Sequence, residues 1–421
     1  MSSTDPVQPR RVVIVGGSVA ALEAVLALHD LAEALSVTVI APEPEFSLRP
    51  LDVALPLSPG HAGLLDLERF MSEHGGRFRR TVTLSVDAEL RTVRCATGPD
   101  EPYDALIVAV GASARPAFQH ALTLSADFLT LDGLLADLEQ GSSRGAAFVV
   151  PKGCTWPLPL YELALMTADE IWGMSPDEVH LHLVTPEPEP LAVFGPEASS
   201  AVTELLQAAG ITLYRGVSAD VRPDGHVDLG REVGLRVDRV IALPVLGGPR
   251  LQGLPTDAQG FIPVDGHGRV IGVDDVYAAG DATDHPVKQG GLACQQADAV
   301  AAHVAAVAGA PVEALPYAPV LRGRLLTGHR ERSIGRTETS GTGEPATKPL
   351  WWPPMQVSGR YLAPYLQARG LVEPPRRDET RGAGVDVRLS RSAGWSAVAS
   401  VASVARPSQP KASDRHAEHH I

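Results

Sequence analysis

Apolar runs separated by polar stretches predict a βαβ unit at the start of the chain. Residues Arg11–Val15 are an apolar run rich in β-branched residues, which indicates a buried strand. A helix is predicted from Leu22 to about Leu35, and a second apolar strand from Val37 to Ile40. Because the three elements follow one another within about 30 residues, we expect parallel strands joined by a right-handed crossover.

A second α/β pattern begins in the middle of the chain. It comprises a strand at Ala146–Val150, a helix around Leu160–Ile171 and a strand at Val179–Val184. Further buried strands are predicted at Ala105–Val110, before this unit, and at Val276–Ala279, after it. The sequence therefore predicts an α/β protein with two related units, the second inserted in the first.

The domain boundaries expected from these patterns divide the chain into four parts. Residues 8–115 and 255–330 form one discontinuous nucleotide-binding domain, and residues 116–254 form a second domain of similar kind. Residues 331–371 form a C-terminal extension rich in aromatic residues, for which a core-capping role is favoured over a surface for a ligand or a partner. Residues 372–421 are dominated by Pro, Arg, Ser and Gly and are predicted to be disordered.

Composition and charge exclude several classes of protein. The chain has 421 residues, 44% of them hydrophobic, and a net charge of −14, which argues against a nucleic-acid partner and against an electrostatic membrane anchor. Three cysteines cannot build a disulfide framework. No signal-peptide pattern or transmembrane run is recognised, so a cytoplasmic location is expected, with peripheral membrane association left open. No metal site is predicted.

The turn after the first strand contains the first motif that carries chemistry. Gly16-Gly17-Ser18-Val19-Ala20-Ala21 lies between a strand and a helix, where a pyrophosphate group would meet the N–H groups and the positive dipole of a helix N-terminus. Against the pattern G-x-G-x-x-G, Ser18 and Ala21 replace the second and third glycines. An acid that would hold the ribose is missing at Ala41, and Glu43 is its substitute.

Two later motifs connect this turn to a known family. Val276–Asp281 is a buried strand ending in Gly-Asp, followed by a helix start at Lys288-Gln289-Gly290-Gly291, and Tyr103–Gly111 is a strand that ends in Ala-Val-Gly. Together the motifs resemble the FAD-dependent pyridine nucleotide-disulfide oxidoreductase-like superfamily, whose members have two dinucleotide-binding domains.

The resemblance implies a site for FAD and a role for the residues at its motifs. Gly-Asp would contact the ribityl-pyrophosphate part of the cofactor, and Lys288 at the helix start would favour the negative charge of reduced flavin. The cofactor-binding residues implied in this way are Gly16, Gly17, Ser18, Ala20, Glu43, Arg49, Ala109, Gly111, Gly280, Asp281, Lys288 and Gln289.

The second domain departs from the superfamily where NAD(P)H would bind. Its first turn, Val150–Pro159, contains one Gly, three Pro and one Trp, and proline has no N–H to offer a phosphate. The following Tyr161-Glu162-Leu163-Ala164 keeps the family's E-x-A helix pattern. Together with the segment Phe46–Leu51, this combination is similar to three branches of the superfamily: the sulfide:quinone oxidoreductases, the flavocytochrome c sulfide dehydrogenases and the type II NADH dehydrogenases. The standard loop for NAD(P)H is absent, so the sequence leaves open whether NAD(P)H binds.

Three functional hypotheses follow from the resemblance. The first is an FAD-dependent oxidoreductase, of NAD(P)H dehydrogenase or quinone oxidoreductase type, that moves electrons from a small donor to a quinone or a protein acceptor without a redox-active dithiol. The second is sulfide oxidation with Cys154 as nucleophile, and the third is a flavin-binding regulatory protein without turnover. The candidate catalytic residues are Lys288, Glu162 and Cys154. An ordinary early-helix glutamate is the alternative for Glu162, and a packing residue is the alternative for Cys154. The donor, the acceptor and the oligomeric state are not predicted.

Overall fold

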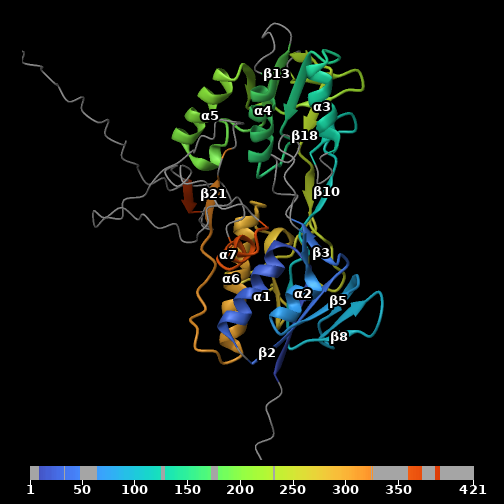
Figure 1. The fold of residues 1–421 in the computed structure, drawn as a ribbon, viewed down its shortest axis with the longest axis vertical. Helices are drawn as coiled ribbons and strands as arrows, with labels where there is room; N and C mark the ends of the chain where they lie inside the picture. The colour runs from blue at the N-terminus through green and yellow to red at the C-terminus, as the bar shows by residue number, and fades with distance from the viewer. Residues whose placement is uncertain are drawn as a thin grey trace, which may run out of the picture.

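The described elements form two α/β lobes placed end to end (Figure 1). The computed structural model describes residues 9–32, 34–47, 64–124, 129–171, 179–230, 233–323, 325, 359–371 and 385–388. Each lobe contains a five-stranded sheet whose paired strands are all parallel. The predicted fold class, two Rossmann-like units with the second inserted in the first, is confirmed.

The sheet of the first lobe has the strand order β20-β9-β1-β2-β5. Its strands are β1 (Arg10–Val15), β2 (Leu35–Ala41), β5 (Arg77–Arg80), β9 (Ala105–Val108) and β20 (Val276–Ala278). The helices α1 (Val19–Leu31) and α6 (Gly290–Val307) pack against each other over one face, beside α2 (Leu67–Glu73). Helix α1 begins earlier than predicted and ends before Leu35, because that residue already belongs to β2.

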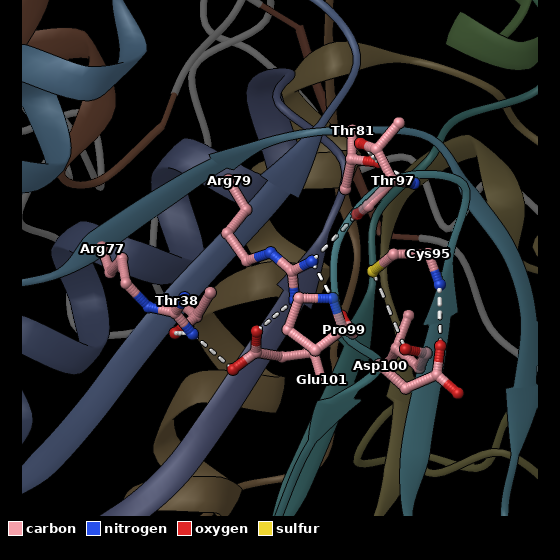
Figure 2. A network of polar contacts seen from close by, with 10 residues as sticks. Thr38, Arg77, Arg79, Thr81, Cys95, Thr97, Pro99, Asp100 and Glu101 are labelled. Atoms are coloured by element: carbon pink, nitrogen blue, oxygen red, sulfur yellow. Dashed lines mark hydrogen bonds and ion pairs between the residues drawn. The ribbon is translucent and has the colours of Figure 1, made fainter.

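An antiparallel meander covers the other face of this sheet. It consists of β6 (Thr83–Asp87), β7 (Thr92–Cys95) and β8 (Glu101–Pro102), and its apolar residues share a core with the sheet. Figure 2 shows how it is tied to the edge strand β5: the carboxylate of Glu101 accepts hydrogen bonds from Arg77 and Arg79. Arg79 also donates to the carbonyl oxygen of Pro99 at 2.8 Å. These ion pairs are structural, since each guanidinium already has a partner.

The sheet of the second lobe has the order β11-β18-β12-β13-β14. Its elements are β11 (Leu122–Thr123), α3 (Leu129–Glu139), β12 (Gly145–Val149), α4 (Leu158–Glu170), β13 (His180–Thr185), the 3-10 turn η3 (Ala192–Phe194), α5 (Pro196–Ala208), β14 (Ile211–Arg215) and β18 (Arg239–Ala242). A small antiparallel sheet is added by β15 (Asp220–Val221), β16 (His226–Asp228) and β17 (Gly234–Arg236). The four-residue run Ala146–Val149 is fully buried, as the continuous apolar pattern predicts for a central parallel strand.

Short elements join the two lobes and extend each of them. The strands β10 (Ser113–Arg115) and β19 (Val245–Gly247) pair antiparallel where the chain passes between the lobes. The remaining short elements are β3 (Glu45–Ser47), β4 (Leu64–Asp66), η4 (Gly280–Ala282), β21 (Val320–Gly323) and β22 (Val385–Arg388). Strand β22 pairs with β21, although it lies in the part of the chain predicted to be disordered.

A C-terminal segment, residues 359–371, returns to the first lobe. Its helix α7 (Leu362–Ala368) buries Leu362 and Leu366 in the core that α1, α2 and α6 share. This packing agrees with the core-capping role predicted for the aromatic extension, while Trp351 and Trp352 lie outside the described residues. Among the described helices, none combines the length and the hydropathy needed to span a bilayer.

Candidate functional site

The turn between β1 and α1 brings backbone groups unusually close together. Gly16 has φ = +120°, and its N–H donates to the carbonyl oxygen of Ile40 at 2.8 Å. A Cβ atom on Gly16 would lie 2.2 Å from the carbonyl oxygen of Ala109, at the end of the neighbouring strand β9. Only glycine fits both the conformation and the space, so the first glycine of the motif has a structural reason.

The N-terminus of α1 is open to an anion. Ser18 is the N-cap residue, but its side chain does not cap the helix, and the first turn carries no acidic residue. The N–H groups of that turn lack intrahelical acceptors, and the helix dipole adds positive potential. Ser18 has φ = −113° and ψ = −167°, an extended conformation open to any residue, so its departure from glycine leaves the turn intact.

The end of β20 meets the start of both helices. Gly280 has φ = +76°, and a Cβ atom there would lie 3.2 Å from Ala20 Cβ in α1 and 3.3 Å from Ala293 Cβ in α6. The Gly280 N–H donates to the side-chain oxygen of Gln296 at 2.6 Å. The end of the Val276–Asp281 motif and the helix start that follows it therefore meet at the carboxyl edge of the sheet, next to the β1–α1 turn.

Asp281 is the acidic group at this point. Burial raises the pKa of its carboxyl group, and the nearby Lys288 opposes that shift. Within the part of the chain that the structure describes, no side chain or backbone N–H donates a hydrogen bond to the Asp281 carboxylate. A partly enclosed carboxylate without a protein donor is suited to accept hydrogen bonds from a ligand hydroxyl group.

The start of α6 supplies the positive side of the site. Lys288 is buried, its Nζ donates to the carbonyl oxygen of Thr283, and it lies 3.7 Å from the centre of the Phe261 ring. Burial lowers the pKa of Lys288 to about 8. Gln289 is the N-cap, and its side-chain oxygen accepts from the Leu292 N–H at 2.8 Å, so this side chain is committed to the helix.

The other predicted cofactor residues border the same edge of the sheet. Ala109 directly follows β9 and is buried, whereas Gly111 has φ = +72° with open space around it. Ala41 is buried at the end of β2, and Glu43 is exposed two residues further on, where an acid could reach a ribose. Arg49 lies outside the described residues.

The corresponding turn of the second lobe is built differently. The N-cap of α4 is Pro157, and Pro159 follows in its first turn, so neither residue has an N–H to offer. The N–H of Leu160 already donates to the carbonyl oxygen of Pro157 at 3.0 Å. Trp156 packs edge-on against Phe194, with ring centres 5.7 Å apart. This turn provides no phosphate cradle comparable to that of β1–α1.

A partly buried acid that follows β13 was not among the site residues predicted from the sequence. Glu187 accepts hydrogen bonds from the Tyr161 hydroxyl group at 2.8 Å and from the Thr185 hydroxyl group at 3.0 Å. In a dinucleotide-binding unit, an acid after the second strand holds a ribose. Here the chain's own hydroxyl groups take that place. The signal was present in the sequence, since Glu187 stands three residues after the predicted strand Val179–Val184.

The two remaining catalytic candidates lie in this lobe. Cys154 is partly buried, and burial raises the pKa of its thiol to about 11, so the thiolate is scarce at neutral pH. Glu162 is completely buried in α4, so neither a catalytic role nor the alternative of an ordinary early-helix glutamate is decided by its position. Among the described residues, no group of three or more His, Cys, Asp or Glu side chains could hold a metal ion.

The lobes touch next to the start of α6. The Thr155 hydroxyl group donates to the carbonyl oxygen of Pro286 at 2.5 Å, and Leu292 of α6 belongs to the core of the second lobe. The loop containing Cys154 and the helix start containing Lys288 are therefore neighbours. Cys294 is separate from both, because it is fully buried and faces Glu23 and Gly359 on the other side of α6.

Comparison with known proteins identifies relatives of both lobes. A family model for the pyridine nucleotide-disulphide oxidoreductases matches residues 163–306. The chain is 28% identical, over 298 residues, to an NADH dehydrogenase-like protein of Mycobacterium tuberculosis, and the match covers 64% of this chain and 72% of that protein.

Solved structures with the same fold include electron-transfer enzymes of two kinds. The sulfide:quinone oxidoreductase of the hyperthermophilic bacterium Aquifex aeolicus has a TM-score of 0.67 and 20% identity, and the match covers 75% of this chain and 82% of that chain. A ferredoxin reductase of Rhodopseudomonas palustris has a TM-score of 0.60 and 21% identity, covering 79% of this chain and 85% of that chain. At this level of identity the likeness shows the fold.

Proposed function

We propose that this chain, a member of the pyridine nucleotide-disulphide oxidoreductase superfamily, moves electrons from a small donor through bound FAD to a quinone or another acceptor. The observation that carries the proposal is the convergence of β20, α1 and α6 on Gly280, beside the Asp281 carboxylate, which accepts no hydrogen bond from the described residues. A nucleotide with a pyrophosphate and free hydroxyl groups satisfies both features.

The residues of the first lobe fit FAD in several respects. The N–H groups at Gly17, Ser18 and the start of α1 would hold the pyrophosphate, since Gly16 allows the turn to come close and no acid opposes the charge. Asp281 would accept hydrogen bonds from ribityl hydroxyl groups, and Glu43 from those of the ribose. When bound, FAD supplies the exchange of electrons between donor and acceptor, which no side chain at this edge can perform.

The start of α6 contributes electrostatics to the proposed site. The positive end of its dipole and the ammonium group of Lys288 both favour negative charge on whatever binds there. Because the pKa of Lys288 is about 8, most of this charge is present at neutral pH. Gln289 acts indirectly, as the cap that fixes the helix start.

The second lobe favours a donor other than NAD(P)H bound in the standard way. The α4 turn lacks the N–H groups that a pyrophosphate needs, and the acid after β13 is occupied by Tyr161 and Thr185. Sulfide chemistry at Cys154 has less support, since its thiol is protonated at neutral pH. Cys294 does not lie beside Cys154 as a second thiol, because it is on the opposite side of α6. The name of the Mycobacterium tuberculosis relative makes NADH the first donor to test.

Anaerobic titration tests the proposal. The chain would be loaded with FAD, and its visible absorbance followed while NADH is added to one sample and sulfide to another. We expect NADH to bleach the flavin, with a bleaching rate that does not saturate below about 1 mM NADH. A Kd of about 1 mM corresponds to a binding free energy of only about 4 kcal/mol. We also expect a soluble quinone, such as a short-chain ubiquinone, to restore the absorbance of chemically reduced protein.

Two outcomes would overturn parts of this account. Saturation by NADH in the micromolar range would show that the second lobe does bind a nicotinamide nucleotide. Failure of quinones and of one-electron acceptors to reoxidise the reduced protein would contradict the oxidoreductase function itself.

A further inference from the structure

The C-terminal segment 359–371 is held in place by a buried carboxylate of α1. Glu23 is completely buried, and its two oxygens accept the backbone N–H groups of Tyr361 at 2.8 Å and Leu362 at 2.7 Å. These N–H groups belong to the start of α7, so Glu23 acts as the cap of that helix from a distant part of the chain (Figure 1).

A second carboxyl group lies against the first. Asp298 comes from α6 and is hydrogen-bonded to Glu23, while its Oδ1 atom is buried and has no partner among the described atoms. A hydrogen bond between two carboxyl groups requires a proton on one of them, because an ionised carboxylate can only accept. Glu23 already accepts two N–H groups, which makes Asp298 the group that carries the proton.

The segment closes tightly over this pair. A Cβ atom on Gly359 would lie 2.3 Å from Glu23 Oε2 and 3.0 Å from Cys294 Sγ, so only glycine fits there. The other ionisable groups that face the pair are the Cys294 thiol, whose pKa burial raises well above its ordinary value, and Arg360, which lowers the pKa of Asp298. The thiol is thus neutral, and Arg360 offsets only part of the cost of burial.

We propose that Glu23 and Asp298 hold one proton between them, and that this proton keeps residues 359–371 docked across α1 and α6. Loss of the proton leaves two negative charges in contact, one fully buried and one half-buried. Departure of the segment that covers them separates these charges at least cost. Glu23 lies about one and a half helical turns from Ser18 in α1, and Asp298 lies about two and a half turns from Gln289 in α6.

The direction of the pH dependence follows from burial. Burial is the largest cause of the raised pKa values of both acids, and it raises that of Asp298 to about 9. With the segment undocked the pair meets water, and its pKa values fall towards the ordinary range near 4. Between about pH 4 and about pH 9 the docked form therefore binds more protons than the undocked form. The equilibrium constant for docking falls by about tenfold per pH unit in this range.

The other contacts of the segment do not titrate in the same way. Arg369 pairs with Glu73, and the Tyr365 hydroxyl group lies 3.3 Å from the same carboxylate. The Tyr361 hydroxyl group lies 3.2 Å from Asp30, and burial raises the pKa of Tyr361 to about 12. The hydrogen bond from Arg369 lowers the pKa of Glu73 to about 2, so this carboxylate stays ionised between pH 7 and 9 and the carboxyl pair carries the expected change.

Hydrogen exchange of the full-length chain tests this proposal without any bound cofactor. The protection factor of a peptide covering 359–371, which corrects for the intrinsic pH dependence of exchange, would be measured by mass spectrometry between pH 6.5 and 9. In the wild-type chain we expect it to fall by about tenfold per pH unit. In Asp298→Asn, whose amide donates to Glu23 permanently, we expect high protection that does not change with pH.

Matched variants separate this device from a simple packing role. The control is Asp30→Asn, because Asp30 contacts the same segment at the surface through the Tyr361 hydroxyl group. We expect this variant to keep the wild-type pH profile of protection. Glu23→Gln, which loses one of the two acceptors, should reduce protection at every pH. The proposal is overturned if wild type and Asp298→Asn show the same pH profile, whether both are flat or both fall. If Asp298→Asn does not fold, a flat wild-type profile alone overturns it.

Discussion

Gly16 and Ser18 show that single residues of one motif differ in how far their identity matters. The carbonyl oxygen of Ala109 excludes any side chain at Gly16, so the first glycine of the pattern could be interpreted correctly from the sequence. Ser18 departs from the pattern, but its extended backbone conformation makes the departure harmless. A motif comparison counts both positions equally, whereas the structure shows that only the first requires glycine.

Replacing Lys288 with methionine should change how stability depends on pH. The pKa of Lys288 is about 8 in the folded chain, mainly because the ammonium group is buried, whereas an exposed lysine titrates near 10.5. Between these values the unfolded chain binds more protons, so wild-type stability rises with pH relative to Lys288→Met by roughly 1 kcal/mol per pH unit. Urea unfolding of both proteins from pH 7.5 to 10 would measure this, and a difference that does not vary with pH would contradict it.

Replacing Cys154 with serine should leave donor-dependent reduction nearly unchanged. The thiol, with a pKa of about 11, is almost entirely protonated at neutral pH and is a weak nucleophile. We expect the rate of flavin bleaching by sulfide in Cys154→Ser to stay within about twofold of wild type. Cys95→Ser, in the meander of the first lobe, is the control. Loss of bleaching in Cys154→Ser alone would revive the sulfide hypothesis.

At the scale of elements, local patterns predicted the strands and helices but not the pairs between them. The run Arg11–Val15 corresponds to β1 within a residue, and the helix start predicted at Lys288–Gly291 contains Gly290, the first residue of α6. Contacts such as Tyr161 with Glu187 and Glu23 with Asp298 join residues that are remote in sequence. A single sequence contains no signal for which polar residues will meet after folding.

Replacing Gly280 with alanine should separate the three elements that form the proposed cradle. The added Cβ would press on Ala20 of α1 and Ala293 of α6 at 3.2 and 3.3 Å, and φ = +76° disfavours any side chain. We expect FAD to bind about tenfold more weakly, a loss of about 1.4 kcal/mol, with a lower melting temperature.

The control for this change is Gly272→Ala. Gly272 has a similar backbone conformation, φ = +83°, but nothing lies within 4 Å of the added Cβ. It should cost stability through the backbone alone and leave FAD affinity unchanged. Equal weakening of FAD binding in both variants, measured by fluorescence titration, would mean that Gly280 has no special place in the site.

At the scale of the whole molecule, the two lobes have kept the same architecture and diverged in their turns. Both lobes have a five-stranded parallel sheet. Only in the first lobe is the first strand of the βαβ unit followed by a turn of small residues and an open helix N-terminus. The second lobe instead packs Trp156 against Phe194 and meets the start of α6 through Thr155. We interpret it as a wall that shapes access to the proposed flavin, because its first turn meets the start of α6. From the sequence, only the absence of the glycine turn was predicted.

The amount of FAD bound per chain is the measurement that tests the central claim most directly. The purified chain would be incubated with excess FAD, freed of unbound cofactor by gel filtration, and analysed for visible absorbance and protein concentration. The account predicts one FAD per wild-type chain, the same ratio in Gly272→Ala, and a clearly lower ratio in Gly280→Ala. No bound FAD in the wild-type chain, or full occupancy in Gly280→Ala, would contradict the cofactor site at the meeting point of β20, α1 and α6.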